Sequence, residues 1–297
     1  MFMRIAVLFI VLAAAALAQG LDTVRIWNQY SVTPNVTYLT ANNYEAKLDV
    51  YRRRGVDTPL PTVISIHGGG WVNGTKGATS LFVLPYLEAG YNVVNITYRL
   101  ARVSLAPAAV EDCRCALKWV ASHAKEYGFD TSKLILTGGS AGGHLSLITG
   151  MLPESAGLDR YCVAGEAPQV AAIVNWYGIT DVADLLEGPN MKSYAVTWLG
   201  SQPDRAAIAK RVSPMTYVRA GLPAILTIHG DADPTVPYSH GVQLTSALKA
   251  AGVKTELVTV PGGRHGGFTL AENLKIFQSI RSFLGGLGLT PPPLRTN

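Results

Sequence analysis

The sequence predicts an α/β protein built on a mainly parallel central sheet that is covered by helices on both faces. From residue 60 onward, short apolar runs of strand character alternate with segments of helical spacing, as is typical of parallel sheets. Within this alternation, residues 134–151 form a buried strand, a glycine-rich turn and an apolar helix in succession. Antiparallel strands are expected only at the amino-terminal edge, where residues 44–51 alternate polar and apolar side chains.

The expected elements follow one another in a regular order. Strands are predicted at 24–27, 36–39, 44–51, 61–66, 91–98, 134–137, 170–177, 224–228 and 255–260, and helices at 108–127, 144–151, 241–251 and 270–284. Residues 178–219 are irregular and contain short helical stretches, and they are too few for a separate domain. We therefore interpret this segment as a small lid inserted into a single domain.

Length and composition agree with one compact globular domain. The chain has 297 residues, of which 48% are hydrophobic and 15% charged, so residues 19–297 can form one large domain. The net charge of +5 is modest, and the basic run at residues 52–54 lies beside Gly55 in an expected turn. No nucleic-acid partner is expected from this pattern.

The amino terminus has the features of a secretory signal peptide. Arg4 precedes an apolar run at 5–18, and Ala16-Leu17-Ala18 fits the small-x-small cleavage pattern. An uncleaved membrane anchor is the alternative, but a membrane span needs about 20 apolar residues. We expect residues 1–18 to be a signal peptide cleaved near Gln19, no stable membrane anchor, and a secreted or periplasmic protein.

Three cysteines make one disulfide possible after export. Cys113 and Cys115 stand two apart on a predicted helix and point away from each other, so they are not expected to pair. A bridge from either of them to Cys162 stays open, with one thiol left over. No metal site is expected, because no histidine–carboxylate cluster accompanies these thiols.

The turn at Gly138–Gly142 has the pattern G-x-S-x-G in the context that this pattern requires. It joins a buried strand to an apolar helix, which is the setting of a nucleophile elbow. Glycines allow the tight turn, the strained serine backbone and the close contact of strand and helix. Ser140 would then present its hydroxyl above the sheet, next to the N–H group of Ala141.

Three more polar segments follow strands, and the carboxyl ends of parallel strands are where α/β proteins place their sites. His67-Gly-Gly-Gly70 offers unhindered backbone N–H groups of the kind that an oxyanion hole needs. Residues 229–237 contain Asp231 and Asp233, either of which could orient a histidine, and residues 261–267 contain His265. The chain order Ser, Asp, His is the order expected when the nucleophile lies on an elbow.

HGGGW, GGSAGG, HGDADPTVP and GGRHGG together resemble the α/β-hydrolase superfamily, over about residues 40 to 285. Within that superfamily they look like the secreted carboxylesterases grouped near hormone-sensitive lipase and the bacterial feruloyl and acetylxylan esterases. This resemblance implies Ser140 as nucleophile, His265 as general base and Asp233, four residues after His229, as the orienting acid. It also implies that the oxyanion N–H groups belong to the residues Gly69, Gly70 and Ala141.

The elbow departs from the hormone-sensitive-lipase form, which has aspartate before the serine where this chain has Gly139. The resemblance therefore favours the feruloyl and acetyl esterase branch. It implies a serine carboxylic ester hydrolase for short acyl or aryl esters, including feruloyl or acetyl esters of plant polysaccharide. Such chemistry needs no metal or organic cofactor, and its partner is a small-molecule or polysaccharide-linked ester.

Two other functions stay open at this point. The same triad can cleave amides, as in an arylformamidase-like or peptidase-like hydrolase, and a noncatalytic binding protein could keep the fold. The sequence leaves open the acyl chain, the alcohol and the oligomeric state. Trp71, Trp176, Tyr177 and Trp198 could line a pocket or belong to the core, and His240 is expected on the surface.

Overall fold

A computed structural model describes residues 24–295 of the chain. The predicted signal peptide, residues 1–18, lies outside the described residues. The expectation of a strand at 24–27 is wrong, because residues 24–29 are helical and the first strand begins at Tyr30. Four residues of alternating character are too short to specify a strand without a partner beside them, and here Trp27 is 81% exposed.

Eight strands form one sheet in the order β1-β2-β4-β3-β5-β6-β7-β8. Their bounds are β1 Tyr30–Ala41, β2 Tyr44–Arg53, β3 Leu60–Ile66, β4 Asn92–Ile96, β5 Phe129–Gly139, β6 Ala172–Trp176, β7 Ala224–Gly230 and β8 Thr255–Val260. β1 and β2 pair antiparallel at the edge, and β3 to β8 run parallel to one another. The predicted mainly parallel sheet with an antiparallel amino-terminal edge is confirmed.

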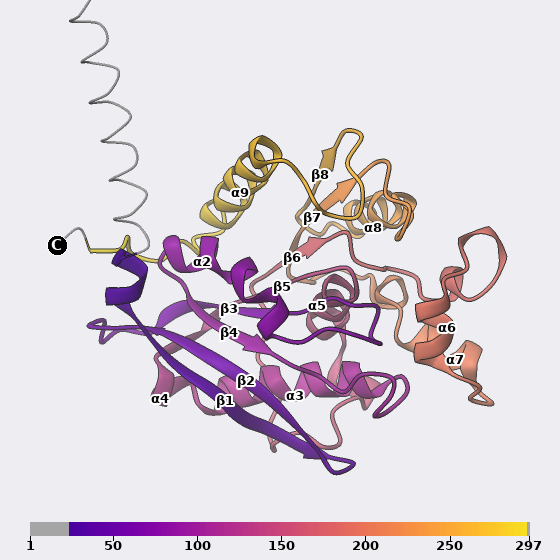
Figure 1. The fold of residues 1–297 in the computed structure, drawn as a ribbon, viewed down its shortest axis with the longest axis horizontal. Coiled ribbons are helices and arrows are strands. Elements are labelled where there is room, and N and C mark those ends of the chain that lie inside the picture. Colours follow the sequence, from indigo (N-terminus) through magenta and orange to yellow (C-terminus); the bar gives the residue numbers. More distant parts are fainter. Residues whose placement is uncertain (1–23, 296–297) are drawn as a thin grey trace, which may run out of the picture.

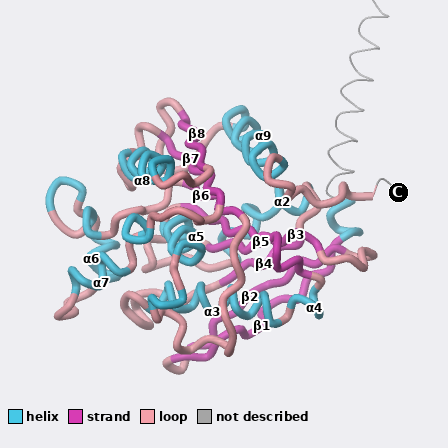
Figure 2. The backbone as a smooth tube through the Cα atoms, turned by 180° about the vertical axis from the view of Figure 1, so that it is seen from behind, coloured by secondary structure: helices cyan, strands magenta, loops and turns pink. Residues whose placement is uncertain are grey.

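Helices cover both faces of this sheet (Figure 1). One face of the sheet is covered by α3 (Ala108–Ser122), α5 (Ala141–Met151) and α8 (Ser239–Ala250). Figure 2 shows the molecule from the side opposite to that of Figure 1. α2 (Leu84–Glu88) and α9 (Leu270–Gly285) pack on the other face. β3, β4, β6 and β7 are buried along their whole length, because both of their faces meet helices.

The predicted helix at 108–127 is interrupted. α3 ends at Ser122, and a separate turn, α4 (Ala124–Tyr127), follows after His123. The imidazole of His123 stacks on Trp119 with ring centroids 4.1 Å apart, and its Nδ1 lies 2.9 Å from the carbonyl oxygen of Trp119. This side-chain contact competes with the backbone ladder where the helix breaks.

The segment 178–219 forms the short helices α6 (Ser193–Leu199) and α7 (Arg205–Arg211), as expected, with 3₁₀ turns before α6 and after α7. Trp198 anchors it to the core by stacking on Trp71 at a centroid distance of 4.1 Å. His144 of α5 accepts a hydrogen bond from the Trp71 indole and contacts the Val212 carbonyl. The segment is therefore joined both to the glycine-rich loop after β3 and to the elbow helix.

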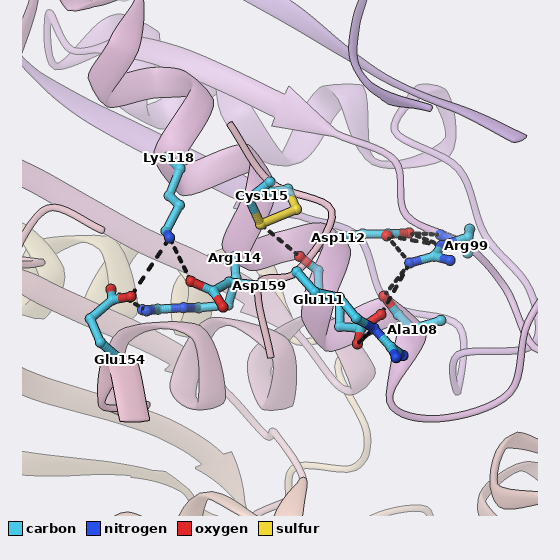
Figure 3. Close-up of a disulfide and its surroundings, with 11 residues drawn as sticks. Arg99, Ala108, Glu111, Asp112, Arg114, Cys115, Lys118, Glu154 and Asp159 are labelled. Carbon is cyan, nitrogen blue, oxygen red and sulfur yellow. Dashed lines mark hydrogen bonds and ion pairs between the residues drawn. A yellow bond between two sulfur atoms is a disulfide. The ribbon is translucent and has the colours of Figure 1, made fainter. Parts of the chain in front are cut away.

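A covalent and ionic strap holds residues 154–162 against α3 (Figure 3). Cys115 forms the disulfide with Cys162, and Cys113 is a buried free thiol. Glu154 binds Arg114 at 2.7 Å, and Asp159 contacts Lys118 at 2.5 Å. Of the two pairings that the sequence left open, the structure therefore has the one through Cys115.

Within residues 24–295, no helix is both long and apolar enough to cross a membrane.

Removing the disulfide should destabilise the protein without touching the site. The bridge closes a loop of 47 residues, and loop-closure entropy for that length corresponds to about 4 kcal/mol. We expect the Cys115→Ala/Cys162→Ala variant to lose free energy of unfolding of this order in urea. Dithiothreitol should lower the stability of the wild type and leave that of the double variant unchanged; equal stability of both proteins would contradict the bridge.

Candidate active site

Ser140 stands alone between β5 and α5 in a strained conformation. Its φ is +57° and its ψ −122°, a region that side chains other than glycine rarely occupy. The flanking glycines permit the turn, because a Cβ on Gly138 or Gly142 would lie 2.4 or 2.1 Å from the carbonyl oxygen of Ile66. The predicted strand–turn–helix context of the serine is present.

The loops after β7 and β8 bring a carboxylate and an imidazole together. His265 Nδ1 lies 2.7 Å from Asp233 Oδ2. The other carboxylate oxygen, Oδ1, accepts the N–H groups of Thr235 at 2.7 Å and Val236 at 3.0 Å. Asp231 instead accepts the N–H of Gly262 at 2.6 Å and only closes a turn. Of the two aspartates that the sequence offered, the structure places Asp233 beside the histidine.

Asp233 is held in its ionised form. Burial raises the pKa of its carboxyl group, but hydrogen bonds from His229, His265 and Val236 together lower it more, so the pKa lies well below its usual range. The contact with His229, whose Nε2 lies 3.3 Å from Oδ2, was not predicted. The spacing of four residues between His229 and Asp233 could have suggested this contact.

The free backbone N–H groups of Gly69, Gly70 and Ala141 indicate an anion site next to Ser140. In the described part of the chain, no hydrogen bond uses the N–H of Gly69, Gly70 or Ala141. Ala141 is the first residue of α5, where the helix leaves its N–H groups free. Gly69 and Gly70 have φ of +116° and +59°, and a Cβ on Gly69 would lie 2.2 Å from the carbonyl oxygen of Asn73. These positions require glycine.

Ser140 and His265 line one cavity of about 550 Å³ at the carboxyl edge of the sheet. The other lining residues are Ile66, Gly68, Gly69, Gly70, Asn73, Gly74, Thr75, Ala78, Thr79, Phe82, Gly139, Tyr177, Tyr194 and Thr235. None of these residues carries a charge, so the cavity suits a neutral ligand. Among the described side chains, no hydrogen bond joins Ser140 to His265; such contacts commonly tighten only when substrate binds.

The ring of Tyr177 lies close to Gly139, the glycine that precedes Ser140. Its ring packs against His265 at a centroid distance of 4.7 Å, and its hydroxyl would lie 3.2 Å from a Cβ on Gly139. A side chain at 139, such as the aspartate of the hormone-sensitive-lipase form, would require this ring to shift by a few tenths of an ångström. Burial, with a smaller contribution from Asp233, raises the pKa of Tyr177 to about 12, which keeps the phenol neutral at physiological pH.

The other aromatic and histidine candidates divide between site and core. Trp71 and Trp198 are fully buried, while Trp176 lines a smaller neighbouring cavity. Tyr194 and Phe82 line the site although no motif marked them.

His240 was expected on the surface and is in fact 3% exposed, because it bonds to Thr180 and Asp184. Within residues 24–295, no group of three or more His, Cys, Asp or Glu side chains could hold a metal.

Two buried histidines should make stability depend on pH. Burial lowers the pKa of His67 and of His144 to about 4. Between about pH 6.5 and pH 4 the unfolded chain therefore binds more protons at these positions than the folded chain, so stability falls as the pH falls through this window. We expect Tm to drop across it and His144→Gln to flatten the drop. An unchanged pH slope in that variant would contradict the assignment.

Comparison with known proteins places this chain in a family. Residues 48–248 match the BD-FAE family. "Esterase LipQ" of Mycobacterium tuberculosis is 29% identical over 254 residues, which are 81% of this chain and 59% of that protein. "Probable carboxylic ester hydrolase LipM" of the same organism is 30% identical over 77% of this chain and 54% of its own length. The chain thus spans little more than half the length of these relatives.

The chain superposes on solved structures of other proteins over nearly the full length of those structures. The apo form of Thermogutta terrifontis esterase 2 superposes with a TM-score of 0.73 and 27% identity, covering 89% of this chain and 97% of that one. That esterase is also known phosphorylated by paraoxon. A truncated carbohydrate esterase from gut microbiota gives a TM-score of 0.74 and 29% identity, with coverage of 87% and 97%. The chain has the α/β-hydrolase fold and belongs to the BD-FAE family.

Proposed function

We propose that the protein is a serine carboxylic ester hydrolase that works through Ser140, His265 and Asp233. The observation that carries this proposal is the convergence on one cavity of a serine on a strained elbow, a histidine bonded to an ionised aspartate, and free N–H groups. A noncatalytic binding protein has no need of a strained serine backbone, which costs about 1–3 kcal/mol.

Each group has a defined task in this reaction. His265 takes the hydroxyl proton of Ser140 as the oxygen attacks the ester carbonyl, and Asp233 holds the imidazole tautomer and stabilises the imidazolium. The N–H groups of Gly69, Gly70 and Ala141 stabilise the oxyanion, and one such donor is typically worth about 3 kcal/mol. His265 then gives its proton to the leaving alcohol. Water, activated by the same histidine, cleaves the acyl-enzyme.

The uncharged cavity favours neutral esters with short acyl or aryl groups. Feruloyl and acetyl esters of plant polysaccharide are the first natural candidates on grounds of kinship, because the BD-FAE family matches and a carbohydrate esterase is among the structural neighbours. The same triad can open an amide, so an arylformamidase-like activity is the second candidate. Its support is the aromatic lining contributed by Phe82, Tyr177 and Tyr194.

A panel of three substrates tests the proposal. Purified protein should release acid from p-nitrophenyl acetate and from methyl ferulate, with saturation kinetics, and act more slowly on formanilide. Activity on the acetate alone would keep the reaction and remove the feruloyl candidate. Faster turnover of formanilide would favour the amidase, and no turnover of any substrate would contradict the hydrolase.

The location of the protein is also part of the proposal. We propose an exported protein that is cleaved near Gln19, on the grounds of the apolar run at 5–18 and its small-x-small end. Mass analysis of the protein recovered from the medium or periplasm should find the new terminus there. An intact Met1 on the exported protein would contradict cleavage.

A further inference from the structure

Tyr177 has an unusual backbone conformation directly after β6. Its φ is +40°, a value that bulky side chains rarely adopt and that is costly to maintain. The N–H of Ser140 donates to the carbonyl oxygen of the preceding residue, Trp176, at 2.9 Å. The N–H of Tyr177 itself donates to the carbonyl oxygen of Ile228 at 2.7 Å. The strained tyrosine is therefore attached to the nucleophile elbow and to β7, the strand that leads to Asp233.

The side chain of Tyr177 lies between the turn that carries the nucleophile and the loop that carries the general base. Its hydroxyl would lie 3.2 Å from a Cβ on Gly139, the residue before Ser140. It would lie 2.9 Å from a Cβ on Gly266, the residue after His265. The tyrosine ring also packs on the imidazole at a centroid distance of 4.7 Å, and all three side chains line the catalytic cavity.

The hydroxyl of Tyr177 is available to a bound molecule. Among the described residues, no hydrogen bond uses this hydroxyl. A second tyrosine of the same lining, Tyr194, already donates its hydroxyl hydrogen to the carbonyl oxygen of Thr235 at 3.0 Å. Burial raises the pKa of Tyr177 to about 12, so its phenol is neutral and can donate at physiological pH. Tyr177 thus adds an unused neutral donor to the cavity.

The esterase reaction generates an acceptor for such a donor. Nδ1 of His265 lies against Asp233, so Nε2 is the nitrogen that can exchange protons in the cavity. When the tetrahedral intermediate collapses, the bond from the carbonyl carbon to the alkoxy oxygen breaks, and its electron pair stays on that oxygen. The oxygen then takes its proton from the imidazolium of His265. Until this transfer is complete the oxygen carries negative charge, which a donor beside His265 stabilises.

We propose that the hydroxyl of Tyr177 is a further catalytic group, which donates a hydrogen bond to the leaving alkoxy oxygen while His265 protonates that oxygen. Tyr177 keeps its own proton, so the step needs no additional acid or base. The proposal rests on the serine esterase function and deepens it. Its assistance is largest for esters of weakly acidic alcohols, a class that includes sugar hydroxyls.

Ethyl acetate and trifluoroethyl acetate test the proposal, because they share the acyl group and are similar in size, whereas trifluoroethanol is the stronger acid. Tyr177→Phe should lower kcat/KM for ethyl acetate about 100-fold, the scale of one lost donor to a developing negative charge, and for trifluoroethyl acetate less than about tenfold. The trifluoroethoxy oxygen is the weaker acceptor and leaves with less help. The variant keeps the ring that packs on His265, so Tm should stay close to that of the wild type.

Two other tyrosines provide matched controls. Tyr194→Phe removes a hydroxyl from the same cavity lining that is already bonded to Thr235, so the ratio of kcat/KM between the two esters should stay as in the wild type. Tyr161→Phe removes a hydroxyl from the strap of residues 154–162, outside the cavity, and should leave kcat/KM for both esters unchanged.

The outcomes separate the Tyr177 donor from the esterase function on which it rests. Equal losses on both esters in Tyr177→Phe would mean that the residue acts only through packing, and would overturn the donor. An unchanged kcat/KM for ethyl acetate in that variant would overturn it too, as would an equally large change of the ester ratio in Tyr194→Phe. Inactivity of the wild type on every ester, p-nitrophenyl acetate included, would instead overturn the esterase function.

Discussion

Ser140→Ala should lower kcat for p-nitrophenyl acetate by about 10⁶-fold, the scale seen when a serine nucleophile is removed from a triad. Without the hydroxyl no acyl-enzyme can form, and only the N–H groups and binding remain to accelerate the attack of water. Tm should change little, because Ser140 contributes no hydrogen bond from its side chain among the described residues and a methyl group fits the same turn. Stopped assays with excess enzyme measure the residual rate.

Ser146→Ala provides the matched control for this loss. Ser146 lies on the same helix, and its hydroxyl donates to the carbonyl oxygen of Gly142 rather than facing the cavity. This variant should keep the wild-type rate within a few-fold. Retention of more than a few per cent of activity in Ser140→Ala would assign the nucleophile to another residue.

Asp233→Asn should lower kcat by about 10⁴-fold, as in serine hydrolases whose orienting aspartate is replaced by asparagine. The aspartate accepts the Nδ1 hydrogen of His265, whereas an asparagine can present an N–H to this atom and favour the wrong tautomer. It also removes the negative charge that stabilises the imidazolium. The measurement is kcat across the pH range, since a lost charge partner should make the variant regain activity in alkaline solution.

Asp231→Asn is the control, because Asp231 only accepts the N–H of Gly262 in an exposed turn. Activity should stay close to the wild type. A large loss in Asp231→Asn together with a small loss in Asp233→Asn would reverse the assignment of the acid.

The sequence predicted those parts of the site in which one local pattern determines the geometry. The elbow around Ser140 needs only a strand, glycines and a helix in succession, and the position of the residue after each strand follows from the parallel sheet. Asp233 could be chosen over Asp231 through the resemblance alone, and the structure places it beside His265. The mainly parallel sheet followed from the alternation of strand-like and helical segments along the chain.

Contacts between distant segments could not be predicted in this way. The ring of Tyr177 occupies the space above Gly139 and packs on His265, which joins three loops that no motif connects. The smaller cavity that Trp176 lines likewise depends on how α9 meets the region around α2. His240 was misjudged because its partner Asp184 lies 56 residues away, and such a contact leaves no local signal.

Labelling with paraoxon tests the role of Ser140 as nucleophile most directly. The reagent phosphorylates a serine only when that serine is activated, so it reports the nucleophile without any assumption about the natural ester. We expect one diethylphosphoryl group per chain, located by peptide mass spectrometry on Ser140, with activity lost in proportion to labelling and no label in Ser140→Ala. A label on another residue, or full phosphorylation with activity retained, would contradict the account.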